Sequence, residues 1–333
     1  MSARNVSLVV IASVIVCAGA AFAQPKLGDL VTEEGYDWII GRWVAAGDGG
    51  KVEMEYQWGL DKNVVLAGLK MGEYRNRGII LMAPDREEIV ETAADNMGGM
   101  WRGAWTEENG DLVQRVEYTT AAGEVHKGEV VHTKVDNDTI TIAMYAAESG
   151  SRSSEPMNKL TYKRQPAAAA ADAVSAEPGG RATDYQKLGD LVAEGGYEWL
   201  AGKWLAGDDD GQYELEHKWA LDKHAILMDL KMGDFAYHGM VMYLPARQEI
   251  IQVGADNMGG AWKGTWEQGD EGATHKVEYA GSDGTTRKME HVYLKTDNDT
   301  FQVKEYGVVD GSRSSDVRRL LTFKRQKAPA ASK

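Results

Sequence analysis

Apolar and polar residues alternate along most of the chain with a period of two. In the segment Lys51–Trp58 (KVEMEYQW), apolar Val52, Met54, Tyr56 and Trp58 are separated by charged or amide side chains. This pattern predicts a β-strand with one buried face and one face in water. Nine further segments have strand character, and clusters of Gly, Asn, Asp or Pro separate most of them. They are Arg42–Ala46, Val64–Lys70, Gly78–Met82, Glu88–Ala94, Trp101–Thr106, Leu112–Thr119, Glu124–Lys134, Thr139–Ala146 and Lys159–Arg164.

The same pattern returns 161 residues later. The register holds without a gap from Lys26/Lys187 to Arg164/Arg325, and roughly 45 % of the paired residues are identical, which indicates a duplicated unit. A residue that a shared chemistry needs should therefore occur in both copies. All ten tryptophans fall into five pairs at this spacing. The pairs are Trp38/Trp199, Trp43/Trp204, Trp58/Trp219, Trp101/Trp262 and Trp105/Trp266.

The pattern also predicts the limits of the domains. Residues 1–23 have a short positive start, an apolar run and the small-residue site Ala21–Ala23, which is typical of a cleaved signal peptide; a retained anchor is the alternative. Two units, residues 24–165 and 186–326, are joined by an Ala/Pro/Gly linker at 166–185 and followed by a disordered tail at 327–333. We therefore expect a periplasmic or secreted protein, with no membrane span after cleavage.

Each unit reads as an all-β domain. A helical lead-in over Leu27–Ile40 precedes about ten short strands, and sequential hairpins of this kind form a sandwich or an up-and-down barrel. A closed barrel has no exposed edges, which suits a chain whose single cysteine, Cys17, lies in the signal peptide. We predict two tandem antiparallel up-and-down β-barrels.

Two short motifs resemble a known family. Gly41-Arg42-Trp43 opens the first strand of copy one, and the last strand ends in Lys163-Arg164; both features recur in copy two. This is similar to the calycin superfamily, which includes the lipocalins and the fatty-acid-binding barrels. The Gly98–Trp105 segment is similar to lipocalin-like domains of bacterial exported proteins. The resemblance implies that the G-x-W tryptophan closes the barrel floor and that a basic side chain of the final strand packs across it.

Composition and histidine usage exclude several functions. The net charge of −14 leaves no basic stripe for a nucleic acid or an anionic membrane surface. None of the seven histidines occurs in both copies, which disfavours a shared histidine mechanism or metal site, and we expect no catalytic residue, metal or cofactor. His217 lies on an apolar face, where a hydrogen-bonded core residue is favoured over a ligand to a group such as haem.

Several polar segments occur in both copies. Asp95-Asn96 and Asp256-Asn257 each precede Met-Gly-Gly, a sequence typical of a tight turn, although the same side chains could point at a ligand from a barrel mouth. Gly150–Ser154 recurs at Gly311–Ser315 and is expected to be a solvated loop. Binding of an anion or a sugar hydroxyl by its arginine is the alternative.

The aromatic residues carry the prediction of function. Tyr56, Trp58, Trp101 and Trp105 alternate inward, so they either line an apolar pocket or fill the barrel. We predict a non-enzymatic binding protein for a small, largely apolar ligand, and the sequence sets no oligomeric state. The alternatives are a tandem surface-interaction module, and a hydrolase or isomerase using carboxylates such as those of Glu53 and Glu55. The predicted ligand-binding residues are Tyr56, Trp58, Trp101, Trp105, Asp95, Asn96, His217, Trp219, Trp262, Trp266, Asp256 and Asn257.

Overall fold

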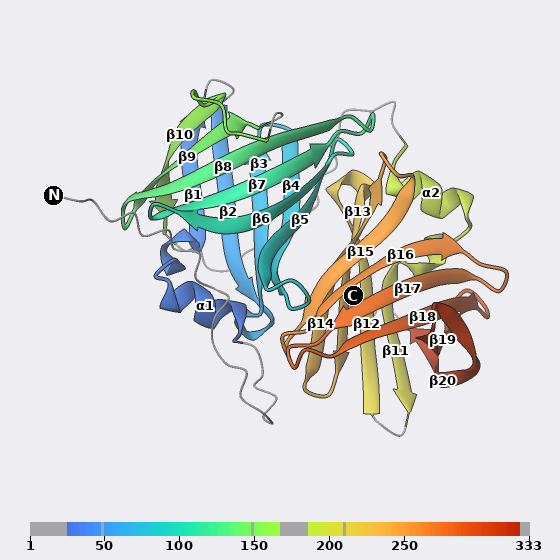
Figure 1. Cartoon of the computed structure of the whole chain (residues 1–333). Helices are drawn as coiled ribbons and strands as arrows, with labels where there is room; N and C mark the ends of the chain where they lie inside the picture. Colours follow the sequence, from blue (N-terminus) through green and yellow to red (C-terminus); the bar gives the residue numbers. More distant parts are fainter. Residues whose placement is uncertain (1–24, 48–49, 148–149, 167–185, 209–210, 327–333) are drawn as a thin grey trace, which may run out of the picture.

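The computed structural model describes residues 25–47, 50–147, 150–166, 186–208 and 211–326. The predicted signal peptide, linker residues 167–185 and the tail at 327–333 lie outside the described residues. The described chain forms two closed antiparallel β-barrels of ten strands, one from each copy (Figure 1). This confirms the prediction of tandem up-and-down barrels.

Every strand of barrel one pairs with its sequence neighbours, and β1 also pairs with β10 to close the barrel. All ten predicted strands are present, and the largest difference is that β4 begins at Tyr74 instead of Gly78. The strands are β1 (Gly41–Gly47), β2 (Gly50–Gly59), β3 (Val64–Met71), β4 (Tyr74–Ala83), β5 (Glu88–Asp95), β6 (Met100–Glu108), β7 (Asp111–Thr119), β8 (Val125–Asp136), β9 (Thr139–Ala146) and β10 (Asn158–Gln165).

Barrel two repeats this topology with one difference at its last strand. The segment expected as a loop at Gly311–Ser315 lies largely within β20, because Ser312 and Arg313 pair with Val309 and Val308 of β19. The loop expectation was therefore wrong for copy two. The strands are β11 (Gly202–Asp208), β12 (Gly211–Ala220), β13 (Ala225–Met232), β14 (Phe235–Leu244), β15 (Glu249–Asp256), β16 (Ala261–Gln268), β17 (Ala273–Ala280), β18 (Thr286–Lys295), β19 (Thr300–Val309) and β20 (Ser312–Arg325).

The helical lead-in is two short elements instead of one continuous helix. In copy one the helix ends early because Gly35 adopts a left-handed conformation with φ of 76°. Copy two has the same break, and both copies have a further 3₁₀ turn between their second and third strands. The elements are α1 (Leu27–Glu33), η1 (Asp37–Ile39), η2 (Leu60–Lys62), α2 (Leu188–Glu194), η3 (Glu198–Leu200) and η4 (Leu221–Lys223).

The G-x-W tryptophan closes one end of each barrel, as the family resemblance implied. The Trp43 side chain is fully buried, and its Nε1 donates to the Ile39 carbonyl at 2.9 Å. The Arg164 guanidinium lies 4.2 Å from the Trp43 ring and donates to the carbonyls of Ile40 and Trp38 at 2.8 and 2.7 Å. In barrel two Arg325 packs on the G-x-W tryptophan in the same way. These two arginines therefore tie the last strand to the lead-in.

The two barrels pack against each other through outward-facing apolar side chains of β3–β5 and β13–β15, which lie side by side in Figure 1. Each copy contributes the same positions, so the interface has an approximate two-fold symmetry. The polar contacts at its edges show the same relation. Asn63 Nδ2 donates to the Asn257 carbonyl at 2.9 Å, and the ring of His224, at the equivalent position, packs on Gly98. The residue pairs at the centre are Val64/Ala225, Ile79/Met240, Leu81/Met242, Ala83/Leu244 and Ala94/Ala255.

Candidate ligand-binding site

Polar and aromatic side chains from five strands gather on the inner wall of barrel one. The strand registers place them on the same face as the buried Trp43; Trp105, for example, lies opposite Gln114 across β6 and β7. The ring centroids of Trp105 and His132 are 4.9 Å apart, and Tyr56 meets Trp105 edge-on at 6.3 Å. We name this set the inner polar group. It consists of Tyr56 (β2), Glu91 (β5), Trp105 (β6), Gln114 (β7) and His132 (β8).

Glu91 is the ionisable centre of the inner polar group. Gln114 Nε2 donates to Glu91 Oε2 at 2.7 Å, and the Trp105 indole N–H faces the carboxyl without meeting hydrogen-bond geometry. Burial raises the pKa of Glu91 to about 7, and the Trp105 and Gln114 donors offset part of this rise. Gly78 leaves the room for the carboxyl, because a Cβ at that position would lie 2.8 Å from Glu91 Oε1. Glu91 nevertheless keeps part of its surface accessible.

His132 completes the group as a neutral side chain. It is buried, and burial lowers its pKa to about 4, so the ring carries no charge at neutral pH. Its Nε2 lies 3.4 Å from the hydroxyl of Tyr56, whose pKa burial raises well above the ordinary value. Both partners are therefore neutral groups that can donate or accept a hydrogen bond at pH 7.

The other predicted tryptophans of barrel one lie apart from this group. Trp101 stands nearer the opposite end of the barrel from Trp43, with its ring 4.7 Å from Tyr118 and its Nε1 donating to the Tyr74 hydroxyl at 3.2 Å. Trp58 packs with the residues of the closed end, where Lys62 Nζ lies 5.9 Å from its ring. The structure thus brings Tyr56 and Trp105 together, but not Trp58 and Trp101.

The predicted polar residues Asp95 and Asn96 are held within the turn that follows β5. Asp95 Oδ1 accepts from the backbone amides of Met97 and Gly99, both at 2.8 Å. Asn96 Nδ2 donates to the Glu73 carbonyl at 2.9 Å. Asp256 and Asn257 make the equivalent backbone contacts in barrel two. These bonds fit the tight turn that the sequence indicates, and a ligand contact by the four residues stays a prediction.

Barrel two carries different chemistry at the same inner positions. Tyr56 and His132 of barrel one correspond to His217 and Tyr293, so the two residue types are exchanged between the same two strands. Glu91 is replaced by Gln252, whose Oε1 accepts from Trp266 Nε1 at 2.9 Å. The amide cannot ionise, and its buried side chain is fully hydrogen-bonded.

Larger side chains occupy the interior of barrel two. The substitutions from barrel one to barrel two are Ala67 to Met228, Asn76 to Tyr237 and Gly128 to Met289. The Tyr237 hydroxyl accepts from Gln252 Nε2 at 2.8 Å and lies over the inner face at Gly239 and Gly254. Met228, Tyr237 and Met289 are all buried, whereas Ala67, Asn76 and Gly128 keep accessible surface. At these three positions barrel one therefore has the shorter and more accessible residues.

The remaining predicted residues of barrel two pack within its interior. His217 is buried, and its Nδ1 lies 3.2 Å from the Leu200 carbonyl. Burial lowers the pKa of His217 to about 4, as expected for a neutral core histidine. Trp266 stacks on His275 at 4.6 Å, and Trp262 donates to Asp256 Oδ2 at 2.9 Å. Trp219, like Trp58, lies below a lysine, with Lys223 Nζ 5.7 Å from its ring.

Sequence reasoning missed Glu91, Gln114 and His132. The requirement that a functional residue occur in both copies removed His132, because its partner in copy two is Tyr293. One signal in the sequence could have found His132. Copy one has Tyr56 and His132 where copy two has His217 and Tyr293, and two positions that exchange residue types in this way are often in contact.

The two closed antiparallel barrels fit a calycin-like barrel fold. Neither the models of known protein families nor the curated proteins gave a match to this sequence. Within the described residues, no helix has the length and apolar character needed to cross a membrane. In the same part of the chain, no group of three or more His, Cys, Asp or Glu side chains is arranged to hold a metal ion.

Proposed function

We propose that this protein is an exported, lipocalin-like binding protein that takes a small, largely apolar ligand into barrel one. The signal-peptide pattern of residues 1–23 supports export to the periplasm or the outside of the cell. The closed barrel supports the binding role, because barrels of this size can enclose a single small ligand. In this proposal barrel two binds no ligand: side chains fill its interior, and it packs against barrel one.

The observation that carries the proposal is the difference in filling between two barrels of the same ancestry. Met228, Tyr237 and Met289 fill barrel two, and the corresponding positions of barrel one have short side chains with accessible surface. A core that only needed to be packed would favour the larger side chains, because unfilled space weakens dispersion contacts and stability. Small residues at these positions are expected where the space has another occupant.

The inner polar group indicates which end groups the ligand carries. Glu91 with a pKa of about 7 can accept a hydrogen bond when ionised and donate one when protonated. The Tyr56 hydroxyl and His132 Nε2, which lie 3.4 Å apart, are two further neutral groups that can form hydrogen bonds. The ring of Trp105 supplies apolar surface beside them. We therefore expect an apolar molecule with one hydroxyl, amide or amine end directed at Glu91.

The carboxylates considered for catalysis do not share this interior. Glu53 pairs with Lys51 and Arg42 at 3.0 and 3.5 Å, and Glu55 lies 4.0 Å from Arg42, all on the outer face of the barrel. Such exposed pairs are ordinary surface ion pairs. The binding role therefore has the better structural support of the two.

The test is to fill barrel one with a side chain that barrel two already uses. Ala67→Met places the equivalent of Met228 on the inner wall, next to the space that we assign to the ligand. Native mass spectrometry of the purified mature protein should show a bound small molecule in the wild type, and this added mass should be absent or at least tenfold reduced in Ala67→Met.

The matched control is the reciprocal variant Met228→Ala, which opens barrel two and leaves barrel one unchanged. It should keep the added mass of the wild type. Equal occupancy of wild type and Ala67→Met would contradict binding in barrel one. The binding role itself would be contradicted if the wild type carries no added mass and if long-chain alcohols or amides do not quench its tryptophan fluorescence.

A further inference from the structure

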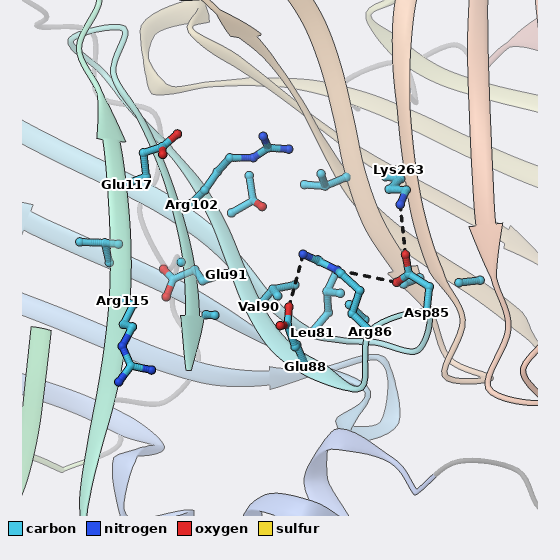
Figure 2. Close-up of a pocket in the computed structure, with 18 of the residues that line it drawn as sticks. Leu81, Asp85, Arg86, Glu88, Val90, Glu91, Arg102, Arg115, Glu117 and Lys263 are labelled. Atoms are coloured by element: carbon cyan, nitrogen blue, oxygen red, sulfur yellow. Dashed lines mark hydrogen bonds and ion pairs between the residues drawn. The ribbon is translucent and has the colours of Figure 1, made fainter. Parts of the chain in front are cut away.

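A groove of about 780 Å³ lies between the two barrels. Its walls are mainly the outer faces of β4–β8 in barrel one and β15–β18 in barrel two, and Glu91 and Gly128 of the inner face of barrel one also line it. Figure 2 shows several of its residues. Charged side chains of both signs line the groove together with an apolar portion. The apolar lining residues include Leu81, Ala83, Val90, Val253 and Ala261.

The groove follows the approximate two-fold relation between the barrels. Equivalent residues of the two copies line it together, as Arg102 and Lys263 do, and so do Glu117 and Glu278. A fully symmetric groove would give both cations the same carboxylate partners. The sequences of the two copies differ at one of these partners.

Lys263 is neutralised, whereas Arg102 is not. Lys263 Nζ lies 3.1 Å from Asp85 Oδ2 and 3.2 Å from Glu278 Oε2. At the position equivalent to Asp85, copy two has Ala246. Arg102 forms no hydrogen bond or ion pair with any residue that the structure describes, and Figure 2 shows its guanidinium reaching into the groove.

Cations and carboxylates both stand near Arg102. Partial burial lowers the pKa of Arg102, and the nearby guanidinium groups of Arg247 and Arg86 lower it further, against the opposing carboxylates of Glu117 and Glu249. Arginine stays protonated under all physiological conditions, so the charge persists and favours an anionic partner. The planar guanidinium can form two parallel hydrogen bonds with a carboxylate.

We propose that the groove binds a small organic carboxylate, with its anionic group on Arg102 and its apolar body against Val90, Ala104 and Val253. Asp85 gives the precedent within the same groove, because it places a carboxylate on the cation at the two-fold-related position. Arg102 lies on the outer face of β6, whereas Glu91 lines both the groove and the interior of barrel one. A variant with barrel one filled therefore separates the two proposals.

The test is calorimetric titration of the mature Ala67→Met protein with octanoate at pH 7.5 and low ionic strength, with neutral octanamide as the comparison. Barrel one is filled in this variant, so neither probe should bind there. Octanoate should bind one to one in the groove and at least tenfold more tightly than octanamide. Ala246→Asp should weaken the binding of octanoate at least tenfold, because the new carboxylate occupies Arg102 as Asp85 occupies Lys263. Arg102→Met should have the same effect.

Two controls separate this site from the barrel interior and from general charge effects. Ala67→Met, which fills barrel one, should keep the octanoate affinity of the groove. Lys276→Met removes an exposed cation outside the groove and should change the affinity by less than twofold. The proposal is overturned if Ala67→Met does not bind octanoate or binds octanamide as tightly. It is also overturned if Ala246→Asp and Arg102→Met, each added to Ala67→Met, both leave the octanoate affinity unchanged.

Discussion

Glu91 is a carboxyl group on the inner wall of barrel one, and barrel two has the amide of Gln252 at the same position. The raised pKa of Glu91, about 7, makes the stability of the protein depend on pH with a definite sign. Between the ordinary value of 4.5 and about 7, folded Glu91 keeps a proton that the unfolded chain has released. The free energy of unfolding therefore falls as pH rises through this window, by at most roughly 3 kcal/mol.

Glu91→Gln should remove this pH dependence. The amide has nearly the same shape as the carboxyl and can also form hydrogen bonds, and barrel two already holds an amide, Gln252, at this position. Unlike the carboxylate, it has no charge to bury. We expect equal stability of variant and wild type near pH 4.5, and a variant more stable by about 1–3 kcal/mol at pH 8. Urea unfolding at a series of pH values measures the difference in the free energy of unfolding between variant and wild type. His132 and His217 titrate in both proteins, so their contributions cancel in this difference.

The matched control for this prediction is Glu87→Gln, which changes an exposed glutamate to the residue that copy two has there, Gln248. It should leave the pH profile of stability unchanged. A difference between wild type and Glu91→Gln that stays constant from pH 4.5 to pH 8 would contradict a buried, titrating carboxyl.

At the level of single residues, the sequence predicted side-chain direction better than side-chain partners. The inward direction of Tyr56 and Trp105 follows from period-two alternation, and the structure has it. Glu91 breaks that rule, because a charged residue stands on the inner face of β5. Alternation alone assigns such a residue to solvent, and only the pairing of β5 with both neighbouring strands shows its direction.

Among the secondary-structure elements, the contact between the final strand and the lead-in closes each barrel. Arg164→Met would remove the cation–π contact with Trp43 and two hydrogen bonds to the carbonyls of Ile40 and Trp38. We expect a loss of about 2–4 kcal/mol in the free energy of unfolding of barrel one. Lys159→Met, on the exposed face of the same strand, should cost less than about 0.5 kcal/mol. Similar losses from both variants in urea unfolding would argue against this closure.

A second contact between elements joins two hairpin turns at the other end of the barrel. Asn96 donates to the Glu73 carbonyl at 2.9 Å and accepts from the Arg75 amide at 2.9 Å, so it holds the β3–β4 turn against the β5–β6 turn. Asn96→Ala should cost about 1–3 kcal/mol and speed amide exchange at Glu73–Arg75. Met97→Ala, an exposed neighbour, should do neither. Unchanged exchange in Asn96→Ala would favour a ligand-contact role over a structural one.

The strands themselves were predictable because each alternates or is bounded by turn residues. The failures occurred where a local signal competed with pairing. Ser312–Ser315 looks like a loop, but pairing with β19 draws the start of this segment into β20. The lead-in looked continuous, because one glycine in a helical pattern does not by itself show that the backbone turns left-handed there.

For the whole molecule, the packing of the barrels against each other was the feature that the sequence analysis did not predict. Its signal was a run of apolar residues without alternation, Ile79-Ile80-Leu81-Met82, which indicates a strand covered on both faces. Ile80 faces the interior of barrel one, whereas Ile79 and Leu81 face barrel two. A strand that is apolar on its outer face must pack against another surface. The sequence pattern does not identify that surface, because the contacts join residues far apart in the chain.

Met242→Glu tests whether this interface holds the two barrels together. Met242 is fully buried between the barrels, and an unpaired carboxylate at that position would cost several kcal/mol unless the barrels separated. Separation exposes the new charge to water while each barrel keeps its own hydrogen-bonded wall, so the barrels should remain folded. Small-angle X-ray scattering should show a larger radius of gyration, with the tryptophan circular dichroism unchanged. Val135→Glu, at an exposed outer position 58 % accessible, should leave both signals as in the wild type. A compact Met242→Glu protein with wild-type stability would show that the apolar cluster does not hold the barrels together.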